Sequence, residues 1–243
     1  MDKPVIVQYW HSKIPPDNVA ELMQTWETAA DEGFVYKFFD DAAALEFIRA
    51  NYDDRTTEAY LSCGVHAMRA DFFRICALLI FPGIYVDADM RRTGTGRRMF
   101  FLKDKSQPLL PLYERLERGI LFKREVRVAN SFMIVKQAQD VLLRAILAAA
   151  IENIEKRISN NVYLVTGPGI ATKWLNTLGS SHPYFKGFEF WTADDLLPYM
   201  RMVGKLPYKS TDDHWVRAQE IRSIFTHSGP TLRARPRAGR RSR

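Results

Sequence analysis

The sequence has few of the features that mark disulfide-rich, secreted or membrane-spanning proteins. Its 243 residues include only two cysteines, Cys63 and Cys76, which excludes a disulfide scaffold and favours a reducing compartment. No apolar run approaches the roughly 20 residues that cross a bilayer, and the stretch 141–151 is interrupted by Arg144. The first residues lead directly into a strand-like segment, so we expect no signal peptide and a cytoplasmic location.

The charge is concentrated at one end of the chain. The formal net charge is +7, and residues 233–243 contribute six arginines and no acid, which leaves +1 for the other 232 residues. This segment is rich in Pro, Gly and Ser and lacks apolar periodicity, which is typical of disorder. We therefore expect one domain over 1–227 and an Arg-rich tail over 228–243. The tail suits peripheral contact with anionic lipids at the inner membrane face rather than a dedicated nucleic-acid site, and a solvated terminus without a partner is the simpler interpretation.

The body of the chain alternates between strand-like and helix-like patterns. Hydrophobic residues make up 47% of the sequence and charged residues 26%, a composition typical of globular proteins. The alternation predicts an α/β fold with a mostly parallel central sheet flanked by helices. The expected strands are 4–10, 34–39, 83–86, 126–135, 162–165 and 188–191, and the expected helices are 18–31 (capped by Asp17), 40–48, 65–81 and 137–158.

Asp87 and Asp89 are the first candidates for chemistry. An Asp-x-Asp triplet is common by chance, but this one directly follows the buried strand 83–86 and the apolar helix that carries Asp71 and Arg74. Open α/β sheets bind ligands at the carboxyl ends of their strands. In an extended chain alternate side chains point the same way, so both carboxylates would face one hard cation such as Mg²⁺ or Mn²⁺. A solvated strand end is the alternative.

Two enzyme classes place carboxylates at such a strand end. In aspartyl-phosphate phosphatases and phosphotransferases the first Asp is the nucleophile, but that pattern requires Thr or Val where this chain has Arg91. In glycosyl transfer from a nucleotide sugar the carboxylates hold a metal against the diphosphate. A third interpretation is a non-catalytic protein that binds through its basic tail, which truncation of 228–243 would test.

The flanking residues favour glycosyl transfer. The segments 5–11 (VIVQYWH), 69–74 (RADFFR) and 82–89 (PGIYVDAD) closely resemble the DXD-containing sugar-transferase family, which includes fungal Golgi mannosyltransferases and bacterial capsular-polysaccharide transferases. The likeness covers roughly residues 4–216 and is most specific in the first 90. Later landmarks are 129–132 (ANSF), 166–168 (TGP) and His214-Trp215. Pro82 stands where the family usually has Gly.

The resemblance implies a GT-A fold and a retaining transfer of a hexose from a nucleotide sugar. Asp89 would bind Mn²⁺ or Mg²⁺, and Asp87 would contact the metal shell or the donor ribose. Asp71 would accept hydrogen bonds from the donor sugar, and Arg74 would pair with Asp71 or reach the donor. A structural Asp–Arg pair is the alternative for the last two, since positions 71 and 74 share a helix face.

The resemblance assigns further contacts less specifically. Trp10 would stack on the donor base, and Tyr85 would offer its hydroxyl to the donor phosphate. Asn130 is a candidate sugar contact, and His214 is the candidate third metal ligand, with Asp212 and Asp213 as competitors. Packing or turn roles remain open for each. The resemblance further implies a UDP- or GDP-hexose as donor, with the base and sugar left open, and a glycan or a lipid-linked sugar in polysaccharide biosynthesis as acceptor.

Overall fold

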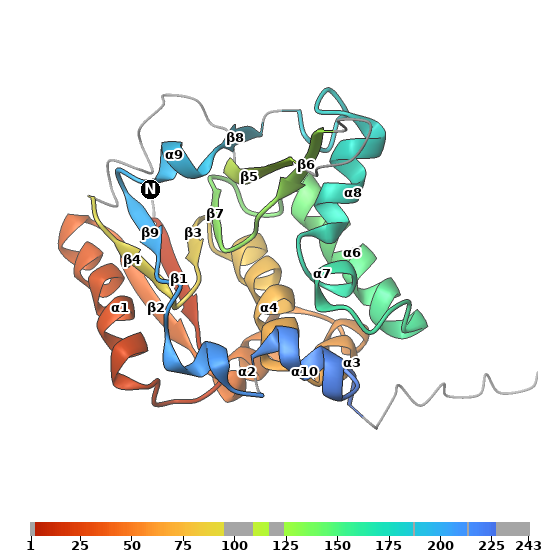
Figure 1. The fold of residues 1–243 in the computed structure, drawn as a ribbon, viewed down its shortest axis with the longest axis horizontal. Helices are drawn as coiled ribbons and strands as arrows, with labels where there is room; N and C mark the ends of the chain where they lie inside the picture. The colour runs from red at the N-terminus through yellow and green to blue at the C-terminus, as the bar shows by residue number, and fades with distance from the viewer. Residues whose placement is uncertain (1–2, 95–108, 117–123, 187, 213, 227–243) are drawn as a thin grey trace, which may run out of the picture.

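The computed structural model describes residues 3–94, 109–116, 124–186, 188–212 and 214–226. These ranges form a seven-stranded sheet in the order β2-β1-β3-β7-β5-β6, with β8 beside β5, and a separate pair, β4 and β9. Helices cover both faces of the sheet (Figure 1). The strands are β1 (Val5–Tyr9), β2 (Val35–Phe39), β3 (Gly83–Val86), β4 (Met90–Arg92), β5 (Leu109–Leu116), β6 (Arg124–Val128), β7 (Phe132–Val135), β8 (Glu189–Trp191) and β9 (Met200–Met202).

The predicted α/β fold is confirmed. Strands β2, β1 and β3 come from the first 90 residues and run parallel to one another. This arrangement agrees with the alternation of strands and helices in that part of the sequence. β7 joins β3 antiparallel, and β5 pairs antiparallel with β6 and β7. Within the described ranges, every helix is too short or too polar to cross a bilayer.

Helix boundaries follow from local capping. The helices are α1 (Asp17–Glu27), α2 (Asp41–Asn51), α3 (Asp54–Leu61), α4 (His66–Ile80), α6 (Val141–Lys156), α7 (Val162–Val165), α8 (Gly169–Leu178), α9 (Ala193–Leu196) and α10 (Trp215–Ile221), with 3₁₀ turns η1 (Thr28–Glu32) and η2 (Pro207–Ser210). The Asp40 side chain accepts a hydrogen bond from the Ala43 amide at the start of α2, and Asp140 does the same for α6.

Several predicted boundaries were wrong. Asp17 lies inside α1 because Pro16 is the N-cap, and the last turn of the predicted helix is the 3₁₀ turn η1. The predicted strand 126–135 is divided into β6 and β7, and the predicted helix 137–158 begins only at Val141. The predicted strand 162–165 is the helix α7, because Val162 and Val165 bury their side chains on one face at a spacing of three residues.

The central strands of the sheet are covered on both faces by hydrophobic cores. This packing fixes the positions of β1 and β3 relative to α4. Alternate residues of β1 divide between two cores: Val5, Val7 and Tyr9 pack against α4 and its neighbours, and Ile6 packs with Trp26 on the other face. Gly83 begins β3 because a Cβ at this position would lie 1.9 Å from the Val5 carbonyl oxygen. This close approach joins the first residues of the two parallel strands, and the register continues through Val7 and Tyr85 toward their carboxyl ends.

Candidate functional site

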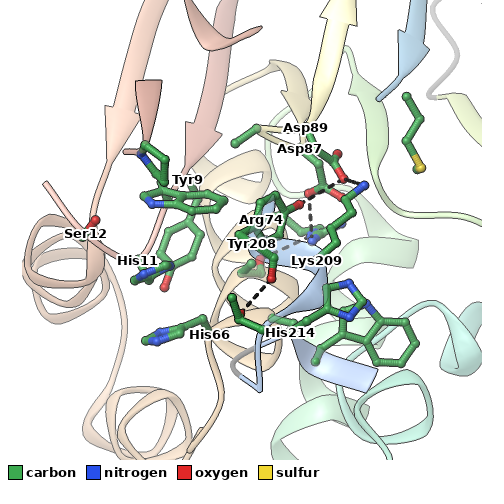
Figure 2. Close-up of a pocket in the computed structure, with 18 of the residues that line it drawn as sticks. Tyr9, His11, Ser12, His66, Arg74, Asp87, Asp89, Tyr208, Lys209 and His214 are labelled. Carbon is green, nitrogen blue, oxygen red and sulfur yellow. Dashed lines mark hydrogen bonds and ion pairs between the residues drawn. The ribbon is translucent and has the colours of Figure 1, made fainter. Parts of the chain in front are cut away.

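A cavity of about 630 Å³ opens at the carboxyl ends of β1 and β3. Its volume is in the range of small-molecule sites, and its position is the one where parallel sheets bind ligands. α4 supplies one wall, and the segment from β9 to α10 supplies another (Figure 2). The lining residues are Tyr9, Trp10, His11, Ser12, Ile14, Pro16, His66, Ala67, Ala70, Arg74, Tyr85, Asp87, Ala88, Asp89, Met202, Tyr208, Lys209, Thr211, His214 and Trp215.

Arg74 is the buried cation of this site. Its Nη2 lies 3.1 Å from Asp71 Oδ1 and 3.1 Å from Asp87 Oδ1, and its side chain is only 4% exposed. Its Nη1 donates to the Asn130 carbonyl, and its guanidinium carbon lies 4.6 Å from the centre of the Tyr85 ring. Burial favours the neutral form, but Asp87 and the other neighbours raise the pKa of Arg74 above its usual value, so the cation is fixed in the site.

Asp71 lies behind the cavity instead of lining it. It is 7% exposed, pairs with Arg74, and accepts a hydrogen bond of 2.8 Å from the Asn130 side-chain amide. A Cβ at Gly167 would lie 3.1 Å from Asp71 Oδ2, so the glycine leaves room for the carboxylate. The Asp71–Arg74 ion pair expected from the shared helix face is present, and Asn130 contacts both of its members.

Asp87 and Asp89 both line the cavity, but not in the extended conformation expected from the sequence. β3 ends at Val86, and the Met90 amide donates to the Asp87 carbonyl, so the triplet forms a turn. In Figure 2 the two carboxylates lie close together, with Arg74 bound to Asp87 and Lys209 bound to Asp89. Lys209 Nζ is 2.6 Å from Asp89 Oδ2, and the Tyr208 hydroxyl donates to the same oxygen at 3.2 Å.

The pKa values of two carboxyl groups at this site, those of Asp87 and Asp71, are raised. Burial raises the pKa of Asp87 to about 7, with Arg74 opposing the shift and Asp89 and Asp71 adding to it. Burial also raises the pKa of Asp71, against the effect of Arg74 and Asn130. The site therefore gathers more negative charge than its burial favours, and positive groups beside it are stabilising.

Aromatic rings form the opposite side of the cavity. Trp10 directly follows β1, is 9% exposed, and lies edge-on to Tyr208 at 5.1 Å between ring centres. Its Nε1 is buried and finds no hydrogen-bond partner among the described residues. Tyr85, predicted to contact a phosphate, has its ring under Arg74 and is fully buried. Trp10 is thus one of the aromatic side chains that line the cavity near the end of β1.

The predicted set of three metal ligands is not assembled in the described part of the chain. There, no three His, Cys, Asp or Glu side chains lie close enough to hold a metal. His214 does line the cavity, and burial and Lys209 lower its pKa. Asp212 is exposed and lies 3.7 Å from Arg217, and Asp213 is outside the described residues. Asp87 and Asp89 are therefore the only predicted ligands that the described structure places together.

Sequence reasoning missed the residues that reach the cavity from distant segments. Tyr208 and Lys209 stand in a Pro-containing turn with no periodic signal that would indicate a site. His66, for which no motif was found, lines the cavity, and its ring stacks on that of His11 at 3.9 Å between centres. Of these residues only His11 lies in a segment on which the resemblance was based, the segment 5–11.

Known proteins resemble the part of the chain that builds this site. Residues 8–95 match a family described as the glycosyltransferase sugar-binding region containing the DXD motif, which includes the triplet 87–89. This match covers about a third of the chain and makes that part similar to the DXD-containing glycosyltransferases. The matched region supplies Trp10, Arg74, Asp87 and Asp89, and the resemblance predicted from the sequence is confirmed.

Two individual proteins are also similar to this chain. A stretch of 58 residues is 36% identical to an uncharacterized glycosyltransferase, L373, of Acanthamoeba polyphaga mimivirus. That stretch spans 24% of this chain and 23% of the viral protein. The solved structure of the PaToxG glycosyltransferase aligns over 91% of this chain and 86% of its own, with 13% identity and a TM-score of 0.44.

Proposed function

We propose that this protein is a metal-dependent hexosyltransferase that uses a UDP- or GDP-hexose and retains the anomeric configuration. The observation that carries the proposal is the common cavity of Asp87, Asp89, Arg74 and Trp10, within the segment that matches the DXD-containing family. The acceptor we propose is a glycan or a lipid-linked sugar. We place the protein in the cytoplasm, with the basic residues 228–243 in peripheral contact with the membrane.

The carboxylates suit a divalent cation by their chemistry. Asp89 Oδ1 is buried and accepts no hydrogen bond from any described residue, so this oxygen has a free coordination position. Mg²⁺ and Mn²⁺ prefer carboxylate oxygens, and Asp87 and Asp89 would hold such an ion, with His214 as the candidate third ligand. When bound, the metal would act as a Lewis acid toward the diphosphate.

The protein's own residues have separable roles in this proposal. Trp10 stacks on the donor base. Arg74 holds Asp87 in place and adds positive charge beside the departing diphosphate, where negative charge develops as the glycosidic bond breaks. Asp71 and Asn130 act through Arg74, because both are bound to it behind the cavity wall. The Tyr85 ring packs against the Arg74 guanidinium in a cation–π contact.

Retention is proposed to follow a front-face path. The bond from the anomeric carbon to the diphosphate oxygen breaks, and the acceptor hydroxyl oxygen forms its bond on the same face. The hydroxyl proton passes to the released phosphate oxygen. Double displacement would require a carboxylate nucleophile beneath the anomeric carbon. Mass-mapping of a covalent glycosyl–enzyme on one carboxylate would refute the front-face path.

The first experiment measures thermal stabilisation and donor hydrolysis across UDP- and GDP-hexoses, with and without Mn²⁺. We expect one nucleotide class to stabilise the wild type only with metal, and Asp89→Asn to lose the effect. Asp212→Asn is the matched control, because that side chain is 78% exposed and lies outside the cavity lining. If no nucleotide sugar stabilises or is hydrolysed by the protein, and a generic phosphomonoester is hydrolysed instead, an aspartyl-phosphate enzyme is favoured.

A second measurement tests the stereochemistry. With the donor identified, proton NMR of the early product reports the anomeric configuration before it equilibrates. A product of the same configuration as the donor supports retention, and the opposite configuration refutes it.

A further inference from the structure

Asp87 and Asp89 have counter-cations of different kinds. Arg74 comes from the middle of α4, is 4% exposed and is held by several partners, so it is a fixed part of the core. Lys209 comes from the short turn η2, and its side chain is 19% exposed. Its ammonium contacts Asp89 Oδ2 at 2.6 Å (Figure 2). It also donates to the Val203 carbonyl oxygen at 3.0 Å.

The Lys209 ammonium contacts one oxygen of the Asp89 carboxylate, Oδ2, whereas Oδ1 of the same carboxylate has no hydrogen-bond partner among the described residues. An ammonium is a compact point charge on a flexible stem, which can move without disturbing the core. The Asp89 backbone stays anchored to the same segment independently of this contact, because the Val203 amide donates to the Asp89 carbonyl at 2.9 Å and β9 pairs with β4. Loss of the Lys209 contact would therefore leave the Asp-x-Asp turn in place.

We propose that Lys209 is a displaceable internal cation that competes with divalent metal for Asp89. In the metal-free protein the ammonium neutralises the carboxylate through Oδ2, so a metal ion that approaches Oδ1 meets a second positive charge on the same carboxylate. Metal without donor is then held weakly. This inference rests on the proposed function for the choice of metal, but it concerns a residue that lies outside the segment matched to the DXD-containing family.

The test is an electron paramagnetic resonance titration of the full chain with Mn²⁺ and no nucleotide. Lys209→Met removes the charge and keeps most of the stem, and it should tighten Mn²⁺ binding by about tenfold, the scale of one charge-assisted hydrogen bond. Lys205→Met is the matched control, because Lys205 is an exposed lysine of the same segment. It should leave the affinity within about twofold of wild type, as expected for a screened surface charge.

Two further variants define the outcome. Lys209→Arg keeps a competing cation and should stay near the wild type, and Asp89→Asn should abolish binding in the Lys209→Met background. Unchanged or weaker Mn²⁺ binding in Lys209→Met, with an unaltered melting temperature, would overturn the proposal, as would absence of binding in both proteins. Tighter binding in Lys209→Met with no response to any nucleotide sugar would support the competition while refuting the proposed transferase.

Discussion

Replacement of Arg74 by Met tests how much the buried charge network contributes to stability. The side chain is 4% exposed and lies 3.1 Å from both Asp71 and Asp87. Met fills much of the same volume but leaves both carboxylates without their cation. Removing one partner of a buried ion pair costs about 3–5 kcal/mol. For a protein of this size that loss lowers the melting temperature by about 6–20 °C.

The pH dependence of this loss has a defined sign. Burial already raises the pKa of Asp71 and Asp87, and Arg74 opposes that shift, so its removal raises both pKa values further. A carboxyl with a raised pKa in the folded state destabilises the fold where it is ionised, and the penalty disappears as it takes up a proton. The stability deficit of Arg74→Met should therefore be larger at pH 8 than at pH 5.

Urea denaturation at several pH values measures the deficit. Arg55→Met is the control, because Arg55 makes two hydrogen bonds to Glu155 but is 60% exposed. Its loss should cost less than about 1 kcal/mol. Adding Asp71→Asn to Arg74→Met should recover part of the deficit. A loss for Arg74→Met no larger than that of Arg55→Met, or one independent of pH, would refute the view that Arg74 neutralises buried carboxylates.

Three further changes test the fold and the ligand site. Gly83→Ala should cost about 1–3 kcal/mol in urea denaturation, since the new Cβ would lie 1.9 Å from a β1 carbonyl oxygen; Gly204→Ala, with open space around it, should cost less than half as much. Trp10→Leu should weaken nucleotide binding by about tenfold in calorimetry if the ring stacks on the base, and unchanged affinity would place the base elsewhere. Asp53→Ala should lose about 1 kcal/mol at pH 7, because the side chain caps α3. Hydrogen bonds from Thr56 lower the pKa of Asp53 in the folded protein. The stabilisation by this cap is therefore fully present above pH 3.8 and is lost as the pH falls through the folded-state pKa. An equal cost of Asp53→Ala at pH 2 would contradict the assignment.

Local signals predicted the first 90 residues better than the rest. β1, β2 and β3 are apolar segments bounded by Pro, Gly or Asp, and α2 begins at an Asp N-cap, so neighbouring residues suffice to define them. α7 was mistaken for a strand, because four apolar residues fit either period and only burial on one face distinguishes them. The short segments after residue 125 therefore depended on tertiary packing.

For the site, local patterns were enough to pick out two carboxylates after a buried strand, a helix with Asp71 and Arg74, and an aromatic after β1. How these charges pair with one another depends on contacts between distant parts of the chain. Asp71 supports Arg74 from behind, and Lys209, 120 positions beyond Asp89 in the chain, contacts that carboxylate at 2.6 Å. The reason is physical: capping and periodicity act between near neighbours in the chain, whereas ion pairing depends on distance in space, which folding alone sets.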